Sequence, residues 1–295
     1  MRLALFLSAA AGALLLAACA PETPAPVEPE ASAPAAEVMA ERPLHVAVLD
    51  CGTIAISNLD AFSSAGDYAG QADEFTDTCY LIHHPKGILL WDLGVPGILK
   101  EAGPVVQDIF TVSLNATITD QLAEHGLTPA DVDYVSISHS HFDHIGQVDQ
   151  VQGATWLVHQ AELDTMIPPD GSAPQTTADQ IALFSAFKNL NREAFTGEKD
   201  VFGDGSVVIF ETPGHTPGHT SLQLKMPESG PILLTGDLYH RSESRALNRV
   251  PRFNFNEEQT MASMAAFEAR AAELGARVII QHEPADIGPL GGMIR

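Results

Sequence analysis

The sequence predicts an α/β domain built in layers around a central β-sheet, and two kinds of pattern support this. Nine short runs rich in β-branched residues are bounded by Gly, Pro or Asp, which is typical of strands. Three longer segments carry apolar residues at helical spacing. Strands that first follow one another and later alternate with helices favour a layered α/β arrangement. A chain of 295 residues with 45% hydrophobic content suffices for one such domain.

The expected strands begin just after residue 43 and recur to the end of the chain. They are LHVAVLDCG (44–52), TCYLIHH (78–84), GILLWDLG (87–94), YVSIS (134–138), TWLVH (155–159), VVIFETPG (207–214), TSLQLKM (220–226), PILLTGD (231–237) and RVIIQHE (277–283). Cys51 and Cys79 lie in the first two runs, where a buried free thiol is the ordinary state. We therefore favour free thiols over a disulfide.

Helices are expected between these strands, at residues 116–126, 177–195 and 257–275. Each carries a stripe of apolar residues, and such stripes are core faces more often than ligand sites. The second segment lies between two groups of histidines. An alternative is therefore that it caps a site, with Phe184, Phe187 and Phe195 as an apolar wall.

Residues 1–42 are expected to lie outside the folded domain, which would span 43–295. Residues 1–19 have one positive charge and a short apolar core, which is typical of a secretory signal. Their end, LLAAC, resembles a bacterial lipobox, which implies cleavage before Cys19, lipid on its thiol and, with Ala20 next, the periplasmic face of the outer membrane. A plain signal peptide is the alternative. Residues 20–42, rich in Pro, Ala and Glu, predict a flexible linker, so the lipid would be the chain's membrane contact.

The formal net charge is 15 − 38 = −23. Nucleic-acid binding needs a basic footprint, so this balance argues against nucleic acid as a partner. We interpret the acidity as a contribution to solubility.

The stretch HSHFDH (139–144) concentrates potential metal ligands directly after a predicted strand. In extended chain, His139 and His141 project to the same side and can bind one ion. Asp143 and His144 follow where a helix is expected to begin, and they point to a neighbouring position. Imidazole with carboxylate suits zinc or a similar metal, so this loop predicts ligands for two ions. A hydrogen-bonded polar loop is the alternative.

Three later strand ends supply further donors: His215 in FETPGHTPGHTS, Asp237 in PILLTGDLYH and His282 in VIIQHEP. In this order, H-x-H-x-D-H followed by these residues resembles the metallo-β-lactamase superfamily over most of residues 43–295. The resemblance implies a four-layer αβ/βα sandwich in a single domain, with a dinuclear site at the shared edge of two sheets.

The resemblance also implies two sets of ligands for two divalent ions, most simply zinc, with Mn, Fe or Co as alternatives. A first metal would be held by His139, His141 and His215, a second by Asp143, His144 and His282, and Asp237 would bridge both. Two such metals can lower the pKa of a shared water to about 7, so that a bridging hydroxide attacks an ester-like carbonyl.

The flanking sequences resemble the N-acyl-homoserine lactonase branch. The segments concerned are LDCGTI (49–54), CYLIHHPKGILLWDLG (79–94), TPGHTPGH (212–219) and GDLYH (236–240). Well-studied lactonases carry a tyrosine three residues after the bridging aspartate, where its hydroxyl assists the substrate carbonyl. Here His240 takes that place and Tyr239 precedes it, so both are candidate catalytic residues together with Asp143 and Asp237.

The resemblance thus implies a hydrolase that opens small-molecule lactones, above all N-acyl-homoserine lactones, as in quorum quenching. Same-fold alternatives are hydrolysis of other esters, thioesters, phosphodiesters or β-lactams. An alternative of another class is a non-catalytic metal-binding periplasmic lipoprotein. Four arginines follow Asp237 within residues 241–252 and could receive an anionic substrate group or pair with the protein's own carboxylates.

Overall fold

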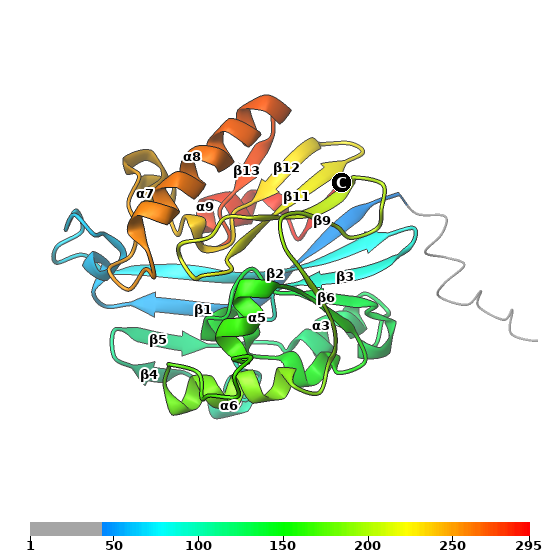
Figure 1. The fold of residues 1–295 in the computed structure, drawn as a ribbon, viewed down its shortest axis with the longest axis horizontal. Coiled ribbons are helices and arrows are strands. Elements are labelled where there is room, and N and C mark those ends of the chain that lie inside the picture. Colours follow the sequence, from blue (N-terminus) through cyan, green and yellow to red (C-terminus); the bar gives the residue numbers. More distant parts are fainter. Residues whose placement is uncertain (1–42) are drawn as a thin grey trace, which may run out of the picture. The chain divides into compact units, whose positions relative to one another are not determined.

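A computed structural model describes residues 43–295. The expected signal peptide, the lipobox cysteine Cys19 and the linker at 20–42 lie outside the described residues and stay predictions. The described part contains two sheets with helices on either side of them (Figure 1).

The larger sheet has nine strands. They are β1 (His45–Ile56), β2 (Asp73–His84), β3 (Gly87–Trp91), β4 (Val105–Gln107), β5 (Phe110–Ser113), β6 (Tyr134–Ser136), β7 (Thr155–His159), β8 (Asn191–Phe195) and β14 (Met293–Ile294). Their order is β4-β5-β1-β2-β3-β6-β7-β8, with β14 paired to β1. Strands β3, β6, β7 and β8 pair in parallel, so helical crossovers are needed between them.

The smaller sheet has five strands in the order β13-β12-β11-β10-β9. They are β9 (Lys199–Asp200), β10 (Val207–Glu211), β11 (Thr220–Met226), β12 (Gly230–Leu234) and β13 (Arg277–Ile279). Only β12 and β13 pair in parallel, and the long helix α8 (Glu257–Leu274) lies between them in the chain. Asn256 caps the start of α8 by accepting a hydrogen bond from the Gln259 N–H, and Gly275 ends it at φ +61°.

The remaining helices are short. They are α2 (Leu99–Ala102), α3 (Ile118–Glu124), α4 (Phe142–Ile145), α5 (Gln160–Met166), α6 (Ala178–Phe187), α7 (Ser242–Leu247) and α9 (Pro284–Ile287). Single 3₁₀ turns occur at η1 (Leu59–Phe62), η2 (Pro129–Asp131), η3 (Val148–Val151), η4 (Gly236–Leu238) and η5 (Gly288–Leu290).

Three buried clusters define four layers. One cluster joins Leu81 of β2 and Leu90 of β3 to α3 and α6, so these helices cover the outer face of the larger sheet. A second joins Trp91 to strands β10–β12 and fills the space between the sheets. A third packs Phe267 of α8 on Leu233, on the outer face of the smaller sheet. The predicted αβ/βα four-layer sandwich is therefore confirmed, and Figure 1 shows these layers.

All nine predicted strands are present, but the helix expected at 177–195 ends early. Helix α6 stops at Phe187, and Asn191–Phe195 forms β8, which pairs in parallel with β7. Phe184 and Phe187 are buried in the core, where Phe187 packs on Trp156. Phe195 packs against His159. The alternative that these three rings form an apolar wall over a site is therefore wrong.

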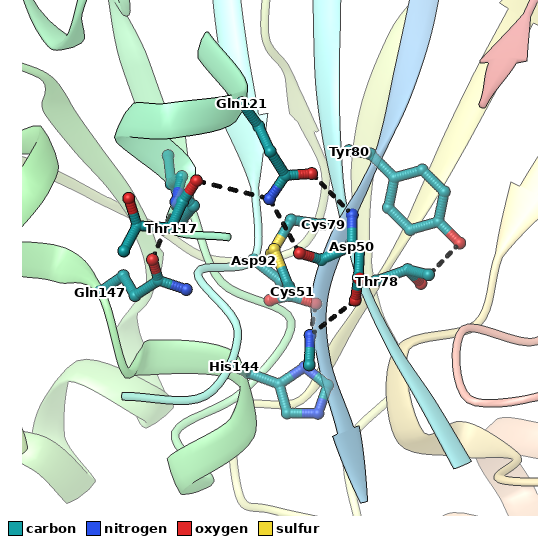
Figure 2. The surroundings of a disulfide bond; sticks show 12 residues. Asp50, Cys51, Thr78, Cys79, Tyr80, Asp92, Thr117, Gln121, His144 and Gln147 are labelled. Atoms are coloured by element: carbon teal, nitrogen blue, oxygen red, sulfur yellow. Dashed lines mark hydrogen bonds and ion pairs between the residues drawn. A yellow bond between two sulfur atoms is a disulfide. The ribbon is translucent and has the colours of Figure 1, made fainter. Parts of the chain in front are cut away.

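The expectation of free thiols is also wrong, because Cys51 and Cys79 form a disulfide. They lie on the neighbouring strands β1 and β2, where a bulge at Asp50 and Gly52 brings their Cα atoms to 5.8 Å. Figure 2 shows the bridge between the two strands, beside the Gln121 side chain, which bonds to both the N–H (2.9 Å) and the carbonyl (2.8 Å) of Asp50.

Within residues 43–295, no helix combines the length and the apolar character needed to cross a membrane.

Candidate metal centre

Ends of strands from both sheets bring the predicted ligands together. His139 and His141 follow β6 of the larger sheet, and α4 starts one residue later with Asp143 and His144 inside it. His215, Asp237 and His282 follow β10, β12 and β13 of the smaller sheet.

The seven side chains form two groups. In each group the donor atoms lie within 4.8 Å of one another: His139, His141, His215 and Asp237 in the first, and Asp143, His144 and His282 in the second. His141 is partly exposed and the other six are buried. The structure therefore brings together the same two sets that the family resemblance implied.

Asp237 lies between the two groups and turns one carboxylate oxygen to each. Oδ2 is 3.6 Å from His139 Nε2 and 3.4 Å from His215 Nε2. Oδ1 is 3.2 Å from His144 Nε2 and 3.0 Å from His282 Nε2. This arrangement is the one a bridging carboxylate requires.

The donor atoms of the first group fit a cation. His141 Nδ1 lies 2.9 Å from His139 Nε2 and 3.0 Å from His215 Nε2. Hydrogen bonds between the rings can satisfy only some of these three nitrogens, two of which belong to buried imidazoles, whereas one divalent ion between them would satisfy all three. The second group (Asp143, His144 and His282) faces the other oxygen of Asp237, so the seven residues together fit two divalent cations.

The charges around the two groups differ. Burial lowers the pKa of His139 and of His141 well below the ordinary value, so both rings are neutral at pH 7. Burial acts in the same direction on His144 and His282, but the nearby carboxylates, Asp237 first among them, outweigh it. They raise the pKa of His144 well above its ordinary value and that of His282 to about 9.

We therefore expect zinc binding to the metal-free protein to release protons at pH 7. His144 and His282 are protonated below their raised pKa values, and a metal must displace both protons, about two per protein. Affinity at the second group should fall as the pH falls below about 9. Calorimetry in buffers of different ionisation enthalpy measures the protons released, and an enthalpy independent of the buffer at pH 7 would contradict the expectation.

Side chains around the second group orient its ligands. Asp92, at the end of β3, accepts hydrogen bonds from His144 Nδ1 (3.0 Å), Gln281 Nε2 (2.6 Å) and the Ser138 N–H (2.6 Å). His282 Nδ1 donates to the Thr76 carbonyl at 2.7 Å. Each of these Nδ1 hydrogen bonds fixes its own imidazole ring so that the Nε2 atom faces the cluster, as metal-binding histidines require.

Asp237, the predicted bridging ligand, is positioned through its backbone. Its N–H donates to His219 Nε2 at 2.9 Å, and His219 Nδ1 donates to the Thr212 carbonyl at 3.0 Å. Burial lowers the pKa of His219 to about 3, so its ring is neutral and can accept this bond. Gly236, at φ +54°, is required here because a Cβ would lie 2.8 Å from His219 Nε2.

The two candidates after Asp237 have different positions. His240 lies at the cluster, where its Nε2 is 3.0 Å from Asp237 Oδ2. The Tyr239 hydroxyl instead donates to Glu268 Oε1 at 3.0 Å, and its ring packs on Phe267 of α8. The structure therefore brings His240, but not Tyr239, to the predicted site.

The four arginines that follow are paired with carboxylates of the protein itself. Arg241 binds Asp73, Arg245 binds Glu268, Arg249 binds Asp67 and Arg252 binds Asp60. The last two pairs hold residues 249–252 against residues 59–68. This confirms the alternative of internal salt bridges.

Comparison with known proteins agrees with this geometry. A family model described as the metallo-beta-lactamase superfamily matches residues 72–282. The chain belongs to the metallo-β-lactamase superfamily. The matched segment contains all seven residues of the two groups.

Relatives within this superfamily carry the name N-acyl homoserine lactonase AttM. The protein from Rhizobium johnstonii is 31% identical over 217 residues, and the one from Azorhizobium caulinodans is 29% identical over 221 residues. Each alignment covers 70% of this chain and 81% of the relative.

Solved structures of the superfamily show the same fold. An N-acyl homoserine lactone hydrolase with N-hexanoyl-L-homoserine bound at its catalytic metal centre has a TM-score of 0.68 at 23% identity, covering 81% of this chain and 93% of that one. AidC, described as a dizinc quorum-quenching lactonase, has a TM-score of 0.65 at 19% identity, covering 85% and 89%.

Sequence reasoning missed three buried polar side chains around the two groups, namely Asp92, Glu162 and Gln281. The sequence does offer one signal for Asp92, because this aspartate ends an apolar strand in the segment WDLG (91–94). In the structure its φ of +62° marks an unusual backbone conformation. Glu162 and Gln281 have no local pattern that distinguishes them from surface residues, yet they are 1% and 0% exposed.

Proposed function

We propose that this chain is a dinuclear metal hydrolase that opens lactones, with N-acyl-homoserine lactones as the first substrates to test. The observation that carries the proposal is Asp237, with one carboxylate oxygen facing each triad. The AttM relatives, named for lactone opening and 29–31% identical, support the substrate class. Such an activity would quench quorum-sensing signals.

The chemistry divides between bound ions and the chain. Two divalent cations, with zinc proposed first, would supply a nucleophilic water at neutral pH and polarise the ester carbonyl. The residues of the two groups would hold these ions and fix their positions. Hydrolysis adds water across the ring ester, breaks the bond between the acyl carbon and the ring oxygen, and leaves an alcohol, a carboxylate and one released proton.

The surroundings of the cluster favour a neutral substrate. All four arginines of residues 241–252 pair with carboxylates, so none of them is left to receive an anionic group. The ring of Phe253, which is 46% exposed, lies 6.3 Å from the rings of His141 and His215. A neutral lactone suits this setting better than a phosphodiester or a β-lactam carboxylate.

His240 is proposed to act beside Asp237. Burial lowers the pKa of His240, so its ring is neutral at pH 7. Because a carboxylate only accepts, Nε2 carries the proton toward Asp237 and Nδ1 is left as an acceptor. His240 would therefore accept a hydrogen bond from a substrate donor, whereas a tyrosine hydroxyl can donate one.

We expect His240→Ala to lower kcat/KM for a lactone by about 10- to 100-fold, because it removes the partner of Asp237 Oδ2. Tyr239→Phe should keep full activity and lose about 1 kcal/mol of unfolding free energy with the bond to Glu268. Steady-state kinetics and denaturant unfolding of both variants test the pair. An inactive Tyr239→Phe beside an active His240→Ala would reverse the assignment.

The function itself is tested with metal-loaded protein and a substrate panel. N-hexanoyl-homoserine lactone, a simple γ-lactone, a thioester, bis-p-nitrophenyl phosphate and a chromogenic β-lactam are compared by kcat/KM. We expect the lactones to be the best substrates. Preference for another class would replace the proposed substrate, and binding of two metals with no turnover would favour the non-catalytic lipoprotein.

We further propose that the protein is exported and anchored by lipid on Cys19 at the periplasmic face of the outer membrane. The Cys51–Cys79 disulfide supports export, because such bridges persist in oxidising compartments. Labelling of cells with a fatty-acid analogue tests the anchor: label on the wild type but not on Cys19→Ser is expected.

A further inference from the structure

Glu162 of α5 is a buried carboxylate that belongs to neither group of metal ligands. It is 1% exposed. Its Oε1 accepts a hydrogen bond from the Ser140 N–H at 2.7 Å. Its Oε2 accepts from the Thr216 hydroxyl at 2.8 Å and from the Gly218 N–H at 3.0 Å. One side chain thus joins two loops that come from different sheets.

These two loops carry the three histidines of the first group. Ser140 stands between His139 and His141, and Thr216 follows His215 directly. Because His141 Nδ1 lies 3.0 Å from His215 Nε2, any change in the spacing of the loops changes the first group.

The loops fit closely against α5 and α6. A Cβ on Gly218 would lie 2.2 Å from the Glu162 nitrogen, so only glycine allows this approach. Gln180 of α6 donates to the Ser140 carbonyl, so the backbone of Ser140 is held through its N–H and its carbonyl. Among the salt bridges of residues 43–295, none involves Glu162, so hydrogen bonds alone offset its burial.

The second group has a different support. Asp92 holds His144 and Gln281, and it has no hydrogen bond to the loop of His215. Glu162 therefore supports the first group, and Asp92 supports the second. Their hydrogen bonds come close to each other only at the backbone of residues 138–140, where Asp92 binds Ser138 and Glu162 binds Ser140.

We propose that Glu162 is a positioning residue for the first metal centre, which fixes the distance between the His139–His141 loop and the His215 loop. It contacts neither metal nor substrate and acts through these loops. The inference rests on the dinuclear centre of the proposed function and is independent of which ester is cleaved.

The test measures zinc affinity in single-centre proteins. His282→Ala removes a ligand of the second group and leaves the first, whereas His141→Ala does the reverse. Glu162→Gln is added to each, and zinc is titrated in competition with a chromophoric chelator. We expect a loss of about 10- to 100-fold in affinity in the His282→Ala background, and no change in the His141→Ala background.

Two further variants complete the design. Thr216→Val removes one of the three bonds to Glu162 and should give a smaller loss in the same background; it serves as the test should Glu162→Gln not fold. Asp200→Asn is the matched control. Its carboxylate also accepts two backbone N–H bonds, from Gly203 (2.9 Å) and Gly205 (2.8 Å), but Asp200 is an exposed residue at the end of β9, so zinc affinity should be unchanged.

A cobalt spectrum gives a second readout, because visible bands of bound cobalt report ligand geometry. In the His282→Ala background, Glu162→Gln should shift these bands. Equal loss of zinc affinity in both backgrounds, or unchanged affinity and spectrum in the first, would overturn the proposal. If no ester is cleaved by the wild type, the proposed function fails while the zinc titration still decides the role of Glu162.

Discussion

Replacing Asp237 by asparagine is expected to lower kcat/KM for lactone opening by about 10²- to 10³-fold or more. Asparagine keeps the shape of the side chain but loses the charge and replaces one oxygen by an NH₂ group, which cannot bind a cation. Because each oxygen of Asp237 faces a different triad, the substitution affects both metals at once. Metal content by mass spectrometry under native conditions and kcat/KM measure the two effects together.

The control for this experiment is Asp204→Asn. Asp204 also pairs with a histidine, His84 at 2.9 Å, but on a loop away from the cluster. The Asp204→Asn protein should bind two metals and keep its activity. An Asp237→Asn protein with full activity would contradict the bridging role. Loss of activity with both metals retained would limit that role to the reaction itself.

The predicted metal ligands lie just after the ends of strands, or in the short helix α4 that follows one, and the local pattern of these strands is clear, so the sequence could place these residues in the fold. Strands β6, β10, β12 and β13 are short apolar runs ended by polar residues, and the strand ends meet at one edge of the two sheets. The spacing of His139 and His141 then puts two donors on one side. Local periodicity placed these strand ends, and the histidine spacing in residues 139–144 indicated metal binding, whereas the full set of seven ligands was implied by the resemblance to the metallo-β-lactamase superfamily.

The remaining features depend on contacts between distant residues. Residues 191–195 continue a helical pattern, yet they form β8 because β7 offers an unpaired edge. Tyr239 and His240 are neighbours in the chain, and their opposite directions follow from the packing of Tyr239 under α8. Glu162 is 22 residues from Ser140 and 56 from Gly218 in the chain, so no local pattern marks it.

The disulfide is a further case of this kind. An apolar run around each cysteine is compatible with a free thiol, and only the pairing of β1 with β2 brings the two together. The pairing of β1 with β2 favours the bridge, but this pairing is not visible in the residues that flank Cys51 or Cys79.

Removing this disulfide is expected to lower the free energy of unfolding by about 3–4 kcal/mol. Cys51 and Cys79 are 28 residues apart, and closing a loop of that length reduces the entropy of the unfolded chain by an amount that corresponds to this value at 25 °C. The double variant Cys51→Ala/Cys79→Ala avoids burying a new hydroxyl at two positions that are 0% exposed. Urea unfolding of the metal-free protein measures the difference.

Reduced wild type should unfold at about the same urea concentration as the double variant, since both lack the cross-link, and Cys19→Ala should behave as the oxidised wild type.

The bridge joins β1 to β2, and β2 contacts the second group through the Thr76 carbonyl. Loss of the bridge should therefore also weaken zinc binding at the second group more than at the first. Equal unfolding curves for oxidised and reduced protein would mean that the cysteines are not joined. The proposal of export would then lose its structural support and rest on residues 1–19 alone, whereas the assignment of the two candidate metal-binding groups, whose seven residues include neither cysteine, would stand.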